Sequence, residues 1–142
     1  MPARQVWIFK FACWVTFLTA AIHMVGHVAG SPPPANATEQ QIRDLITNYY
    51  VPMPGGGERS ILDFQTGFSL MFATMLATFG AVGLMVVRRG TEDPVLVRGV
   101  ARAFALSSAV LLVISLTHFF IIPSLFIALM TVSFAVASVS ER

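Results

Sequence analysis

Residues 103–140 read AFALSSAVLLVISLTHFFIIPSLFIALMTVSFAVASVS and contain no charged side chain. A continuous helix over this stretch would be about 57 Å long, whereas the hydrocarbon core of a bilayer is about 30 Å thick. The stretch must therefore fold back on itself. Pro123 predicts the position of the break, because proline lacks a backbone N–H and disfavours helix at the residue before it. We accordingly predict two membrane spans here, at residues 97–122 and 124–140.

Two further stretches without charge lie between Lys10 and Glu39 and between Asp63 and Arg88. Each holds the roughly 20 apolar residues that one transmembrane helix needs, so we predict spans at residues 7–30 and 60–87. The whole chain is 56% apolar and 11% charged, whereas a soluble domain carries about a quarter charged residues. The predicted fold is all-α: one membrane domain over residues 1–142, built as an integral four-helix bundle. A cleavable signal peptide around residues 11–22 is the rival interpretation of the first span.

The basic residues gather at one set of span ends. Seven of the nine are Arg4, Lys10, Arg88, Arg89, Arg98, Arg102 and Arg142; the other two, Arg43 and Arg59, lie in the loop 31–59, where Glu39, Asp44 and Glu58 balance them. By the positive-inside rule, both termini and the loop between the second and third spans are cytoplasmic, and the loop 31–59 lies outside. No basic run resembles a nucleic-acid footprint, so we expect the lipid bilayer, and no nucleic acid, as partner.

The predicted outer loop, residues 31–59, has its own pattern. A run of prolines ends the first span, and apolar residues then recur at helical spacing, which predicts an extracytoplasmic amphipathic helix on the membrane surface. The repeating residues are Ile42, Leu45, Ile46, Tyr49 and Tyr50. Pro52, Pro54 and the glycines at 55–57 predict a flexible hinge. Ser60 and Asp63 have the spacing of a capping box, which would begin the second span.

Three histidines are present, and the topology places all of them near the outer surface. His23 and His27 lie at the outer end of span one, four residues apart and so on one helix face. His118 lies near the outer end of span three, and Asp63 enters span two from the same side. Together these four residues form a hypothetical metal site for zinc, iron or copper, or a haem site with His27 and His118 as ligands.

Simpler interpretations of the same residues remain open. Each histidine can hydrogen-bond a carbonyl near the interface, and Asp63 can cap its helix. The sequence His23-Met-Val-Gly-His27 has Met24 where the zinc protease motif H-E-x-x-H carries its general base, which excludes that activity. We expect no catalytic residues.

Glycines indicate where helices approach closely. Gly26 and Gly30 form a G-x-x-x-G pair in span one, and Gly80 and Gly83 lie in span two. Small residues allow helix backbones to approach in membranes. The pattern fits either packing inside one bundle or a homo-oligomer formed through Gly26 and Gly30.

Two segments carry a resemblance to a known group: residues 23–27, HMVGH, and residues 59–70, RSILDFQTGFSL. They resemble small bacterial four-helix integral membrane proteins of unknown function, over about the first 90 residues. The resemblance implies a bacterial inner-membrane protein and marks His27, Asp63 and Gly67 for testing. From the sequence we expect a non-enzymatic structural protein or an accessory subunit with a membrane protein partner. The alternative is a metal- or haem-binding protein with its site at the outer leaflet.

Overall fold

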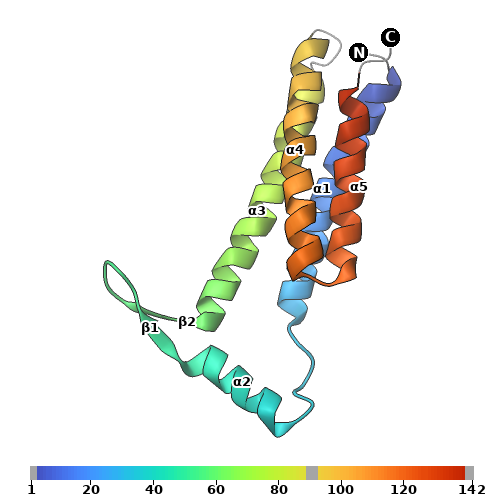
Figure 1. The fold of residues 1–142 in the computed structure, drawn as a ribbon. Coiled ribbons are helices and arrows are strands. Elements are labelled where there is room, and N and C mark those ends of the chain that lie inside the picture. The colour runs from blue at the N-terminus through green and yellow to red at the C-terminus, as the bar shows by residue number, and fades with distance from the viewer. Residues whose placement is uncertain (1–2, 89–92, 140–142) are drawn as a thin grey trace.

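A computed structural model describes residues 3–88 and 93–139. These residues form five helices and one two-stranded hairpin (Figure 1). The elements in chain order are α1 (Ala3–Ala29), α2 (Ala37–Asn48), β1 (Tyr50–Pro52), β2 (Glu58–Ser60), α3 (Ile61–Arg88), α4 (Pro94–His118) and α5 (Ile121–Ser138). Arg89 and Arg142, which we used for the orientation, and Ser140, the predicted end of span four, lie outside the described residues.

Four of these helices, α1, α3, α4 and α5, are long and apolar enough to cross a membrane. This agrees with the four predicted spans, although the first and third begin three or four residues earlier than expected. The early start of α4 has a clear cause, because the Asp93 side chain accepts a 2.9 Å hydrogen bond from Leu96 N and Pro94 occupies the first turn. Asp93 and Pro94 therefore begin the span.

The bundle is not closed around a common axis. Helix α1 packs against both α3 and α5, and α4 packs along α5, whereas α3 and α4 make few contacts with each other. Both ends of the described chain lie at one end of the bundle, which we call the terminal end (Figure 1). Helix α2 and the β-hairpin lie at the opposite end, which we call the hairpin end. There α3 diverges from the other helices.

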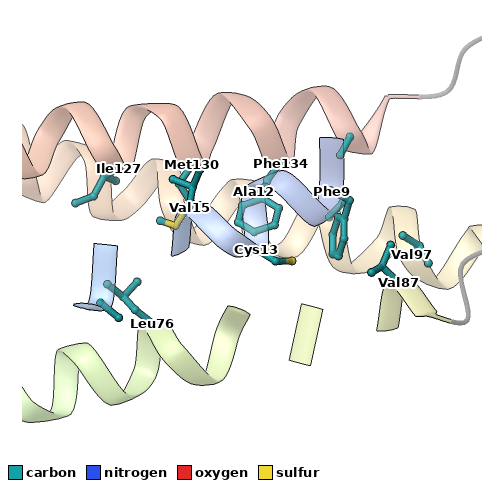
Figure 2. Packing of buried hydrophobic residues seen from close by; sticks show 13 residues of the cluster. Phe9, Ala12, Cys13, Val15, Leu76, Val87, Val97, Ile127, Met130 and Phe134 are labelled. Atoms are coloured by element: carbon teal, nitrogen blue, oxygen red, sulfur yellow. The ribbon is translucent and has the colours of Figure 1, made fainter. Parts of the chain in front are cut away.

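In α1 and α3 the buried residues lie toward the terminal end, whereas those of α5 run along almost the whole helix, from Ser124 to Ala137 (Figure 2). Buried residues of α1 run from Gln5 to Ala20, and those of α3 from Ala73 to Val87. Phe9 and Phe104 each meet Phe134 edge to face, with ring centroids 5.6 and 5.2 Å apart. The hairpin-end turns of α1 and α3 therefore project beyond the packed core.

Two glycines of α3 allow its close contact with α1. A Cβ atom on Gly83 would lie 2.4 Å from Cys13 Sγ, and one on Gly80 would lie 2.7 Å from the Phe17 ring. Gly26, in contrast, has no atom within 4 Å of such a position, and Gly30 has a φ of +71° just beyond the last residue of α1. Gly30 is thus accounted for as a helix terminator. The packing interpretation is confirmed for Gly80 and Gly83 only.

The break between α4 and α5 does not lie at Pro123, which corrects the sequence prediction. Helix α4 ends at His118, and Phe119 and Phe120 have extended backbones, with ψ of 170° and 169°. Helix α5 begins at Ile121, so that Pro123 lies in its first turn. A proline is tolerated there because the first N–H groups of a helix have no partner within the helix.

The predicted hinge is also wrong, because residues 50–60 form an antiparallel hairpin. Tyr50 pairs with Ser60 and Pro52 with Glu58. Met53 N donates to Gly57 O, and the three glycines 55–57 have φ between +82° and +101°. Glycine adopts these backbone angles without the steric cost that other residues incur. The glycines therefore close a turn rather than provide a free joint.

The segment predicted to be amphipathic is helical as far as Asn48, whereas Tyr49 and Tyr50, which were predicted to continue the helical repeat, have left the helix and Tyr50 begins β1. Asn36 caps α2, since its side chain accepts from Glu39 N at 2.9 Å. The Glu39 carboxylate in turn accepts from Ala35 N and forms an ion pair with Arg43 at 3.0 Å. These bonds lower the pKa of Glu39 from its ordinary value of 4.5, the bond from the Ala35 backbone contributing most.

Candidate functional site

His23 lies on α1 just beyond the packed core. Its ring is half-buried and meets the ring of Phe72 on α3 edge to face, with centroids 5.1 Å apart. Its Nε2 atom is buried and has no hydrogen-bond partner within the described part of the chain. A buried polar atom without a partner is uncommon in proteins and costs free energy, so His23 is a candidate for binding a group from outside the chain.

His27 lies one turn further along the same face of α1 and is also half-buried. Side chains spaced by four residues lie about 6 Å apart on a helix. The expectation that His23 and His27 share a face therefore holds, and both lie in the unpacked part of α1.

His118 is exposed at the last residue of α4. Its Nδ1 lies 3.2 Å from the carbonyl oxygen of Ile114 and 2.6 Å from Thr117 Oγ1. The Thr117 hydroxyl itself lies within donating distance of the Val113 carbonyl, at 2.9 Å. Since a carbonyl can only accept, this arrangement fits a hydrogen on Nδ1, which leaves Nε2 as the ring atom that can accept a hydrogen bond or bind a metal ion.

The histidines lie at similar distances along the bundle. Phe9 and Phe104 stack with ring centroids 6.4 Å apart. His23 follows Phe9 by 14 residues and His118 follows Phe104 by 14 residues. The rise is about 21 Å in each helix. However, His118 is on α4, which packs along α5, whereas His23 faces α3.

Asp63 does not share this level. Gly83 on α3 packs on Cys13 of α1, so this contact serves as a common reference for the two helices. Asp63 lies 20 residues from Gly83 along α3, whereas Ala29, the last residue of α1, lies 16 residues from Cys13. Measured along each helix, Asp63 is therefore about 6 Å further from the Gly83–Cys13 contact than Ala29 is. It forms the predicted capping box: Ser60 N donates to Asp63 Oδ2 at 2.8 Å, and Asp63 N donates to Ser60 Oγ at 3.1 Å. The capping interpretation is confirmed.

The structure does not bring the predicted metal ligands together. Within residues 3–88 and 93–139, no three His, Cys, Asp or Glu side chains are close enough to hold a metal ion. His23 and His27 remain a pair on α1, His118 lies on another face, and Asp63 caps α3. The depth of the histidines could be deduced from the sequence, but the rotation of each helix could not.

An apolar groove between α3 and α4 was not expected. It has a volume of about 350 Å³ and is lined by Phe72, Met75, Leu76, Phe79, Ser107, Val110 and Leu111. Phe72 belongs both to this groove and to the contact with His23. The groove exists because α3 and α4 pack on different neighbours, a feature that hydropathy does not encode. The one polar lining residue, Ser107, offered a possible signal, since it interrupts the apolar centre of α4.

A second, more open hollow lies on the hairpin end of α3. It has a volume of about 270 Å³ and is lined by Arg59, Asp63, Phe64, Gly67, Phe68 and Met71. The Arg59 side chain is exposed, and one of its N–H groups donates to Glu58 O at 2.8 Å. Asp63 and Gly67 were marked through the resemblance, whereas Arg59 and the aromatic residues were missed.

Comparison with known proteins gave no match: no family model matches the chain, and no curated protein or solved structure was found to be similar to it. The resemblance noted from the sequence therefore stays a prediction.

Proposed function

We propose that the chain is a non-enzymatic accessory or structural subunit of a complex in a bacterial inner membrane, with both termini cytoplasmic. The observation that carries this proposal is the open side of the bundle between α3 and α4. Helix α3 packs mainly on α1 and α4 mainly on α5; the two meet where Phe79 stacks on Phe104, and an apolar groove of about 350 Å³ stays open beside this contact. A partner helix at this place would complete the bundle.

The polar residue in the groove supports a protein partner over lipid alone. Ser107 lies near the middle of α4 and is exposed, and its hydroxyl makes no hydrogen bond within the described residues. Other hydroxyls of this helix are satisfied: Ser108 donates to Ala105 O, and Ser115 bonds to Ser124 on α5. Lipid tails offer no hydrogen-bond partner, whereas a neighbouring helix does.

The proposed orientation rests on the level of the basic residues. Gly83 on α3 lies against Cys13 on α1 and Phe104 on α4, so these three residues mark one level of the bundle. Arg102 lies two residues nearer the terminal end than Phe104, and Arg88 lies five residues nearer it than Gly83. Lys10 lies three residues from Cys13 in the same direction. Basic residues are enriched on the cytoplasmic side of inner-membrane proteins. A topology reporter fused after Arg142 is expected on the cytoplasmic side, and an external reporter would contradict the orientation.

Photo-crosslinking in native membranes tests the accessory role. Val110 lines the groove and is 61% exposed, and Val132 on α5 is 60% exposed and lies outside it. A crosslinking amino acid at position 110 is expected to capture one discrete membrane protein, while position 132 captures lipid. Equal labelling patterns at the two positions would contradict the proposal.

Metal or haem binding at the hairpin end is the second candidate function, favoured by the unpartnered Nε2 atom of His23. In this form the site consists of His23 and His27, whose spacing suits two ligands on one helix face. Purified protein should then carry stoichiometric metal or a Soret band, and the H27A variant should lose it. Protein with neither signal would exclude this function.

A further inference from the structure

The hollow on the hairpin end of α3 contains a glycine that the packing of the described chain does not explain. Gly67 lies within α3, and a Cβ atom built on it would have no neighbour within 4 Å. Glycine inside a helix is about 1 kcal/mol less favourable than alanine. Gly80 and Gly83 on the same helix are accounted for by α1, whereas Gly67 serves only to deepen the hollow that it lines.

The depth of this hollow matches the boundary between lipid tails and headgroups. Helix α3 ends at Arg88, near the level of Lys10 and Arg102. A hydrocarbon core of about 30 Å corresponds to about 20 helical residues, which brings the far boundary to Phe68. Phe68 is exposed and lines the hollow. Asp63 then lies about 7 Å further out, within the headgroup layer.

The hollow carries one charge of each sign above an apolar floor. Arg59 uses one N–H group on Glu58 O, and its other donors have no partner within the described residues. Asp63 uses Oδ2 on Ser60 N, and Oδ1 has no bond in the described chain. The two side chains line the same hollow and interact electrostatically, but they lie beyond ion-pair distance of each other. A ligand that carries both charges could therefore contact both side chains.

We propose that this hollow binds one zwitterionic phospholipid with an ammonium headgroup, of the phosphatidylethanolamine class. The phosphate accepts hydrogen bonds from the Arg59 guanidinium, and the ammonium group donates to the Asp63 carboxylate. The first part of an acyl chain crosses the notch at Gly67 and lies along Phe68 and Met71. The opposite charges complement this headgroup, whereas an anionic headgroup without an ammonium group would leave Asp63 unpaired and repelled.

Native mass spectrometry of the full chain tests the proposal. Delipidated protein is mixed with equal amounts of phosphatidylethanolamine and phosphatidylglycerol, and the retained lipid is counted. We expect one phosphatidylethanolamine per chain, retained about tenfold over phosphatidylglycerol, as the loss of one charge-assisted contact implies. Equal retention of the two lipids, or retention of neither, would overturn the proposal.

Matched variants separate this site from general lipid contact. Gly67→Leu fills the notch, and Gly99→Leu is its control, because Gly99 on α4 is equally open but lines neither hollow. We expect G67L and Arg59→Gln to lower retention about tenfold and G99L to leave it unchanged. Asp63→Asn keeps an oxygen for Ser60 N and should abolish the preference between the lipids. Circular dichroism verifies the fold of each variant. Equal behaviour of G67L and G99L refutes the assignment.

Discussion

Replacing Gly83 by alanine should weaken the contact between α1 and α3. The added Cβ would lie 2.4 Å from Cys13 Sγ and 3.3 Å from the Phe104 ring. Non-bonded carbon atoms favour separations of about 3.5–4.0 Å, so the helices or the thiol must retreat by about 1 Å. Overpacking of this kind costs about 1–3 kcal/mol, and removal of the glycine returns up to about 1 kcal/mol of helix propensity. With the full gain in helix propensity, the expected net loss of unfolding free energy is about 0–2 kcal/mol.

The Cys13→Ala background isolates the cause of this loss. Cys13 is fully buried, and its Sγ is the nearest atom to the added methyl group. In the C13A protein the alanine at position 83 occupies the space vacated by sulfur, so Gly83→Ala should be neutral or slightly stabilising. The coupling energy between the two positions is then about 1–3 kcal/mol, in the range typical of side chains in contact.

Positions 13 and 83 form a double-mutant cycle of four proteins: the original chain, G83A, C13A and the double variant. Unfolding by SDS in mixed micelles, followed by circular dichroism, measures the stability of each. Gly26→Ala is the control, because a Cβ at position 26 meets no atom within 4 Å. We expect it to preserve or raise stability by a few tenths of a kcal/mol. The reasoning is refuted if G83A has the same effect with and without the Cys13 thiol, since close approach would then not be its cause.

Three hydrogen bonds of the described residues can be tested in the same way. Ser115→Ala should destabilise the α4–α5 pair by about 0.6 kcal/mol, and by less once Ser124→Ala removes the unpaired hydroxyl; SDS unfolding measures both. Asn36→Ala should loosen the first turn of α2 by about 1 kcal/mol, seen as faster hydrogen exchange at the Glu39 amide. The pKa of Glu39 is lower in the folded chain than its ordinary value. The stability that its carboxylate contributes to the start of α2 is therefore fully present above the ordinary glutamate pKa and is lost as the pH falls through the lowered pKa. An NMR titration of the Ala35 amide should show this, and a signal that stays constant through that range would contradict it.

The spans could be predicted because their signal is local and large. Charge-free stretches of the right length mark the spans directly, and the capping box of Ser60 and Asp63 acts on the residues that contain it. The error at Pro123 has a related cause. Proline restricts the backbone on its N-terminal side only, and the first turn of α5 accommodates it without losing a hydrogen bond.

The lateral arrangement could not be predicted, because it depends on which face each helix turns toward its neighbours. All four spans are apolar almost all round, so hydropathy does not mark the buried face. The rotation of α1 is set instead by close approach, in which Gly80 and Gly83 admit Phe17 and Cys13. That rotation turns His23 toward Phe72. It is a consequence of packing and is invisible in the spacing of the histidines.

The packing of the helices shows which glycines and polar atoms have a structural role and which do not. In the terminal half, Gly80 and Gly83 pack against α1 and Thr16 bonds to its own helix backbone, although Gly99 on α4 is open and Gln5 Oε1 has no partner in the described chain. In the hairpin half, Gly67 has no neighbour and His23 Nε2 has no partner in the described chain. Stability selects residues that pack, so residues that remain unexplained by packing are the ones to test for binding. Substitutions near Gly83 should therefore change unfolding and leave lipid retention intact, and substitutions at Gly67 should do the reverse.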